Sequence, residues 1–151
     1  MSINNHRSLL TIIILPLLAV IGSCSKLCNS GYEGSRCNQL STTKFVGKWS
    51  AVDTPGTLIY TDTIIRGSVI EDLVLSSSFS NHHFSHNISA SVINNVLTIP
   101  YQQPDSASIF IAATGIMSDD HNTIVFAYQI TVGADSTRVT SIYGGTWTRQ
   151  N

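Results

Sequence analysis

Apolar and polar residues alternate along much of the chain after residue 44. Between Ile124 and Val132 the even positions carry large apolar side chains, while the odd positions become small or polar along the run. A period of two residues is typical of a strand that buries one face. No stretch from Phe45 onward shows the 3.6-residue period of an amphipathic helix. The pattern therefore predicts an all-β domain.

Short runs rich in β-branched and aromatic residues recur eight times in this region, and turn-forming residues separate them. The connections are short, and Asn94-Asn95 suits a two-residue hairpin turn. Short connections favour antiparallel pairing of consecutive strands. We expect strands at Phe45–Val52, Leu58–Arg66, Asp72–Ser77, Asn87–Ile93, Val96–Tyr101, Ile109–Met117, Thr123–Val132 and Arg138–Trp147. The core is expected to include Val92, Val96, Leu97, Ile99 and Tyr101.

Eight antiparallel strands in sequence order can close into an up-and-down barrel, which leaves no exposed sheet edge. A sandwich of two sheets is the alternative, because periodicity alone does not separate the two. In either case residues 44–151 form one β domain.

The N-terminus carries a short apolar run with a positive residue before it. Arg7 precedes Leu9–Ile21, thirteen residues interrupted by Thr11 and Pro16. At about 1.5 Å per residue, such a helix is too short for a hydrocarbon core about 30 Å thick. We therefore expect residues 1–23 to be a signal peptide rather than a permanent membrane span.

The run ends in Ile21-Gly22-Ser23-Cys24, which resembles the bacterial lipobox. The resemblance implies cleavage before Cys24 and transfer of a diacylglyceryl group to its thiol, with fatty acyl chains such as palmitate as the membrane anchor. The alternative is an ordinary signal peptide with a coincidental cysteine. If Cys24 carries lipid, Cys28 and Cys37 remain as a pair that can bridge in an oxidising compartment.

The segment from Cys28 to Cys37, C-x-x-G-Y-x-G-x-x-C, resembles the C-terminal loop of an EGF-like module. The other four cysteines of that module are absent, so we expect no complete calcium-binding EGF domain. We interpret residues 24–43 as a lipidated N-terminus and a single-disulfide remnant that spaces the β domain from its lipid.

The lipobox, the EGF-like loop and the following Lys44–Ser50 segment together resemble Bacteroidota lipoproteins with a small lipocalin-like, calycin-type domain. Gly47-Lys48-Trp49 looks like the lipocalin G-x-W signature. The resemblance implies that Trp49 closes the base of the barrel beneath an arginine, either Arg149 or Arg138. The alternative is that two tryptophans simply fill the core, since Gly145-Thr-Trp147 matches the pattern equally well.

Charge and the residues around Cys24 bear on partners and location. Charged residues make up 11% of the chain, and without Arg7 seven basic residues face nine acidic ones, a net charge near −2. No basic field is available for nucleic acid. Ser25 lacks the aspartate that resembles an inner-membrane retention signal, and Lys26-Leu27 is not an acidic export stretch. We expect anchoring in the outer membrane, at its periplasmic face.

Candidate chemistry is sparse. His82, His83 and His86 form H-H-x-x-H in a serine-rich segment, without the glutamate of a zinc protease motif. A solvated loop and a metal-assisted hydrolase are the two interpretations. No nucleophile elbow or phosphate-binding glycine loop occurs. We expect a non-catalytic binding or structural module without cofactor, whose partner is a small apolar ligand or an envelope protein.

Overall fold

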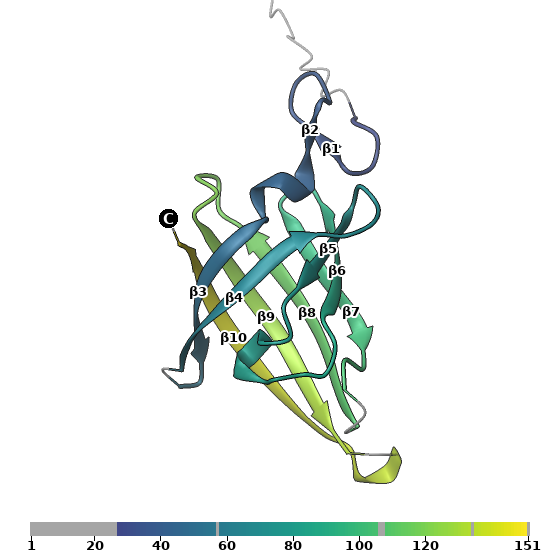
Figure 1. Ribbon diagram of the computed structural model, residues 1–151, viewed down its shortest axis with the longest axis vertical. Coiled ribbons are helices and arrows are strands. Elements are labelled where there is room, and N and C mark those ends of the chain that lie inside the picture. The colour runs from purple at the N-terminus through teal and green to yellow at the C-terminus, as the bar shows by residue number, and fades with distance from the viewer. Residues whose placement is uncertain (1–26, 57, 106–107, 134, 151) are drawn as a thin grey trace, which may run out of the picture.

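The computed structural model describes residues 27–56, 58–105, 108–133 and 135–150 (Figure 1). The predicted signal peptide and Cys24 lie outside these residues. Within them, no helix has the length and apolar character needed to cross a bilayer.

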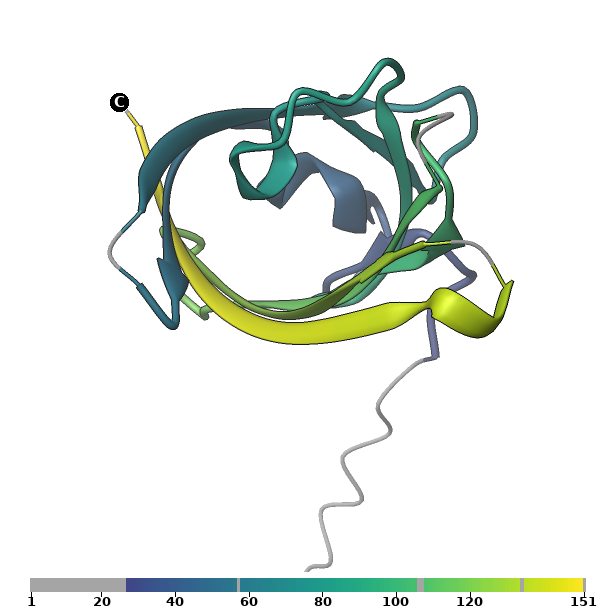
Figure 2. The same cartoon turned by 90° about the horizontal axis from the view of Figure 1, so that it is seen from below.

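Eight strands form a closed antiparallel barrel in which each strand pairs with the next and the last pairs with the first (Figures 1 and 2). The prediction of an up-and-down, lipocalin-like barrel is confirmed, and the sandwich alternative is wrong. The strands are β3 (Gly47–Thr54), β4 (Ile59–Arg66), β5 (Asp72–Leu75), β6 (Ile88–Ile93), β7 (Val96–Gln102), β8 (Ile109–Met117), β9 (Thr123–Val132) and β10 (Val139–Arg149).

The short elements lie at the ends of the barrel. The disulfide loop, residues 28–40, contains β1 (Tyr32–Glu33) and β2 (Gln39–Leu40), and the predicted Cys28–Cys37 bridge closes the part that precedes β2. Three 3-10 segments follow along the chain: η1 (Ser41–Lys44), η2 (Phe79–Asn81) and η3 (Asp135–Thr137). Figure 2 shows that η1 and η2 lie within the outline of the barrel.

The two ends of the barrel carry different connections (Figure 1). The end that we call the disulfide end holds the disulfide loop, η1 and the β4–β5, β6–β7 and β8–β9 turns. The opposite end, called the far end, holds η2 and the β3–β4, β7–β8 and β9–β10 connections.

The core differs from the expected set at two positions. Val92, Leu97 and Ile99 are buried, but Val96 and Tyr101 are exposed. Because Leu97 and Ile99 point inward, the alternation turns Val96 outward. A register shift between Ile99 and Gln102 then leaves Tyr101 on the outside, where its ring stacks on Phe110.

The first barrel strand begins two residues later than expected. The chain from Ser41 to Lys44 is a 3-10 helix, and Phe45 follows it with a fully buried side chain. Phe45 is therefore a core residue that precedes the strand rather than part of it.

Candidate functional site

Trp49 and Arg149 close the barrel at the disulfide end. The Arg149 guanidinium lies 4.4 Å from the centroid of the buried Trp49 ring, and the Trp49 indole donates to the Phe45 carbonyl at 2.9 Å. Arg149 also donates to the carbonyls of Lys44, Val46 (3.0 Å) and His121 (3.0 Å). A planar guanidinium with several N–H donors suits such a junction. Here the arginine stacks on Trp49 while its donors join η1, the residue just before β3 and the β8–β9 turn.

Gly47 and Arg138 complete the residues expected for closure. A Cβ atom on Gly47 would lie 2.9 Å from the Arg149 Nη1 atom, so a side chain there would displace the guanidinium. Arg138 lies instead over the Phe110 ring, 4.9 Å from its centroid. Arg149 is therefore the arginine that the structure brings to Trp49.

Aromatic side chains fill the interior of the barrel beside η2. Phe79 of η2 enters the barrel and contacts Phe126, Tyr128 and Trp147, with ring centroids 5.9, 5.1 and 5.6 Å away. Trp147 and Phe126 also pack against each other at 4.6 Å. All four side chains are buried. The space where a lipocalin-like barrel holds a ligand is occupied by a segment of this chain.

A polar cluster fastens this segment to the barrel wall. The Ser80 hydroxyl donates to the Asp53 carboxylate at 3.3 Å and lies 2.7 Å from the Tyr128 hydroxyl. The Tyr60 hydroxyl donates to Asp53 at 3.3 Å. Burial raises the pKa of the Asp53 carboxyl above its usual range and also raises the pKa of both tyrosines. Both tyrosine hydroxyls therefore stay protonated at neutral pH, and the hydrogen bonds of Ser80 hold η2 against the barrel wall.

Asp62 is a second inward-facing carboxylate, and it is 1% exposed. One oxygen accepts hydrogen bonds from the Ser76 hydroxyl and from the Thr63 amide at 2.6 Å. The other oxygen has no hydrogen-bond partner among the described residues. Burial raises the pKa of Asp62 to about 6, although both hydrogen bonds oppose the shift.

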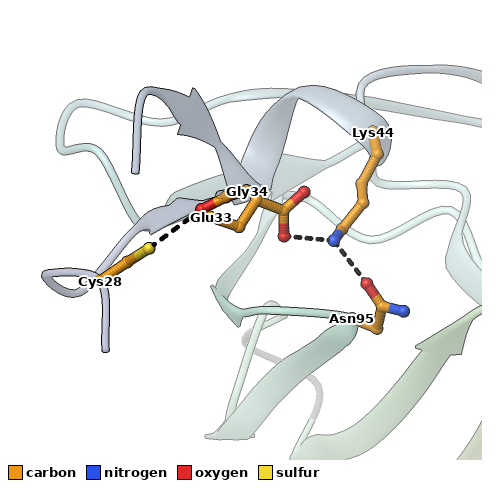
Figure 3. Close-up of polar contacts among 5 residues, drawn as sticks. All are labelled: Cys28, Glu33, Gly34, Lys44 and Asn95. Carbon is orange, nitrogen blue, oxygen red and sulfur yellow. Dashed lines mark hydrogen bonds and ion pairs between the residues drawn. The ribbon is translucent and has the colours of Figure 1, made fainter. Parts of the chain in front are cut away.

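Lys44 joins the disulfide loop to the barrel (Figure 3). Its ammonium lies 2.5 Å from the Glu33 carboxylate of the loop and 2.5 Å from the Asn95 side-chain oxygen of the β6–β7 turn. The Lys44 side chain is only 5% exposed and that of Glu33 is 20% exposed. Because Arg149 binds the Lys44 carbonyl, one residue connects barrel closure with loop position. We call this arrangement the Lys44 clamp.

Two further contacts, one within the disulfide loop and one with the β4–β5 turn, restrict the position of the loop. Within it, the Cys28 sulfur lies 3.5 Å from the Gly34 carbonyl oxygen. Gly31 has φ +81°, and a Cβ atom there would lie 2.5 Å from Ile70, so only glycine allows this close approach. The loop therefore packs against the β4–β5 turn as well as being clamped by Lys44.

A pocket of about 470 Å³ lies between the disulfide loop and the barrel. Its lining includes Glu33, Leu40, Lys44 and His121. The pocket shares Lys44 and Glu33 with the clamp, so its shape depends on the position of the loop.

The three histidines do not form a metal site. His82 stacks on Phe84 at 5.2 Å, His83 is exposed, and His86 lies 3.2 Å from the Pro104 carbonyl. Partial burial, together with the neighbouring His83, lowers the pKa of His82. The described residues contain no group of three His, Cys, Asp or Glu side chains arranged to hold a metal ion. The described residues therefore lack the metal-binding geometry that the metal-assisted hydrolase alternative requires.

Sequence reasoning missed the clamp and the interior polar clusters. Lys44 and Asn95 are 51 positions apart, and Ser80 is 27 positions from Asp53. Strand alternation gives the one available signal, because it places Asp53 and Asp62 on the inward face with Trp49.

Comparisons with models of known protein families, with curated proteins and with solved structures found no match to this chain.

Proposed function

We propose that the protein is a lipid-anchored component of the cell envelope whose β-barrel is a non-catalytic binding or structural module. The anchor is the lipid on Cys24, and the expected location is the periplasmic face of the outer membrane. The observation that carries the proposal is the Cys28–Cys37 bridge. It uses two of the three cysteines, so the lipobox cysteine is the one remaining thiol for acylation.

The filled barrel interior supports a module that binds through its surface. Phe79, Phe126 and Trp147 occupy the central space, and hydrogen bonds through Ser80 hold the η2 segment in place. A small apolar ligand would have to displace this segment before it could enter. We therefore favour an envelope protein as the partner over a small ligand.

The anchor is tested by labelling cells with a radioactive or clickable fatty acid. We expect the natural chain to take up label and to fractionate with membranes, and a Cys24→Ala variant to lose both properties. A Cys28→Ser/Cys37→Ser variant is the matched control, because it removes two cysteines but leaves the lipobox intact. An unlabelled parent chain would refute the proposal.

The module is tested by affinity purification of the lipidated protein from solubilised envelopes, followed by mass spectrometry. We expect a stoichiometric envelope protein rather than an extracted small molecule. Recovery of a stoichiometric apolar compound within the barrel would contradict the preference for surface contact.

A further inference from the structure

Four exposed β-branched residues form a row across the outer wall near the disulfide end. Ile93 pairs with Val96, Val96 with Ile116, and Ile116 with Val125, so the row crosses four adjacent strands. These residues are between 39% and 64% exposed. Three inter-strand spacings of about 4.8 Å give the row a length of about 14 Å. We call these four residues the apolar band.

The neighbouring outward row is uncharged. Ser91 pairs with Thr98, Thr98 with Thr114, and Thr114 with Ala127. The β6–β9 part of the wall on the far-end side of the band is therefore neutral. Acidic residues lie at its margins: Asp72, which pairs with Ser91 from β5, Glu71 before it, and Asp119 and Asp120 in the β8–β9 turn. An apolar strip with polar groups on its outer edge suits the boundary between acyl chains and headgroups.

The N-terminal segment leaves the domain beside this band. Leu27 is 94% exposed, and it lines a cavity of about 430 Å³ together with Ile93 and Asn94. Leu27 is three positions after Cys24 in the sequence, a span of about 10 Å when extended. The Lys44 clamp and the contact of Gly31 with Ile70 hold the loop against this end of the barrel.

From this geometry we infer that the apolar band and Leu27 dock on the lipid bilayer, so that the β6–β9 wall near the disulfide end lies against the membrane and the far end is held farther from it. The inference rests on the proposed lipid anchor, because the lipid on Cys24 brings Leu27 to the interface. Docking in this way would fix the orientation of the barrel on the membrane, with the apolar band and Leu27 as the contact surface.

The far end provides matched reference positions. Val139 and Ile59 are outward-facing strand residues with 66% and 68% exposure, close to the 64% of Ile93. Val139 stands at the opposite end of β10 from Arg149. Along a tilted strand of this length, the two ends are about 25 Å apart in the direction of the barrel axis.

The test uses the full lipidated chain in vesicles of phosphatidylethanolamine and phosphatidylglycerol. Single reporters are placed in the band, by Ile93→Trp or Ile116→Trp, and at the far end, by Val139→Trp or Ile59→Trp. The native Trp49 and Trp147 are fully buried and give a constant background. Near-ultraviolet circular dichroism checks that each variant folds.

Lipids brominated along their acyl chains quench tryptophans that enter the bilayer. We expect quenching at the band reporters to exceed that at the far-end reporters by about threefold or more. Equal quenching at all four positions on vesicles that float with the protein would overturn the docking inference and leave the anchor intact. Band reporters shielded from aqueous iodide but not quenched by lipid would also overturn it, and would indicate a protein on this surface. Failure of the protein to float with vesicles would refute the anchor itself.

Discussion

Replacement of Asp62 by asparagine tests whether a buried carboxylate destabilises the barrel at neutral pH. Asp62 points into the interior, and its second oxygen has no hydrogen-bond partner among the described residues. Burial raises its pKa to about 6 from the ordinary value of 3.8. The amide of the Asp62→Asn variant would keep an acceptor for the Ser76 hydroxyl and the Thr63 amide while removing the charge.

The raised pKa determines the sign of the pH dependence. Between about pH 4 and pH 6 the folded chain retains a proton on Asp62 that the unfolded chain has lost, so stability falls as pH rises. A shift of about two pH units corresponds to about 3 kcal/mol, at about 1.4 kcal/mol per unit. The loss is complete above about pH 7 and nearly absent at pH 4.

Urea unfolding of the parent and the Asp62→Asn variant at pH 4 and pH 7.5 measures this difference. We expect the variant to be more stable by up to about 3 kcal/mol at pH 7.5 and by less than about 1 kcal/mol at pH 4. Asp120→Asn is the control, because hydrogen bonds from Ser118 and Asn122 lower the pKa of that exposed carboxyl. Equal stability at pH 7.5, or a difference that grows toward pH 4, would refute the reasoning.

Three further substitutions test the closure, the interior and the clamp. Arg149→Met should lower the free energy of unfolding by about 2–4 kcal/mol in urea, because it removes charged hydrogen bonds and the contact with Trp49, whereas Arg138→Met should change it by less than about 1 kcal/mol. Phe79→Ala should cost about 3–5 kcal/mol in thermal unfolding, and an unchanged melting temperature would show that η2 is not packed inside the barrel. Lys44→Met should accelerate amide hydrogen exchange in the disulfide loop but not in the barrel strands, and the exposed Lys48→Met should leave both unchanged.

The strands could be predicted from the sequence because each buries one face. For Ile109–Met117 and Thr123–Val132 the expected and observed bounds are identical. Errors occur where apolar character and strand position disagree. Phe45 is buried but precedes its strand, and Tyr101 is aromatic but points outward after a register shift.

The interior polar groups could not be predicted in the same way. Alternation places Asp53 and Asp62 inside, whereas a carboxylate by itself favours water. Burial of Asp53 depends on Ser80 and Tyr128, which reach it from distant parts of the chain. The serine-rich segment around Ser80 has the composition of a solvated loop, yet Phe79 and Phe84 within it are buried.

The Lys44 clamp also determines how the domain would bear a mechanical load. When the N-terminus is pulled, the covalent ring between Cys28 and Cys37 cannot unravel, so the force passes to η1. Through its contacts with Asn95 and Arg149, Lys44 transmits part of this force to the β6–β7 turn and to β10. The remaining force acts along β3, which is hydrogen-bonded to a strand on each side. Bonds perpendicular to the strands share such a force in parallel rather than opening one after another. If the N-terminus is anchored as proposed, a pull on it would therefore load these bonds together and leave the barrel closed.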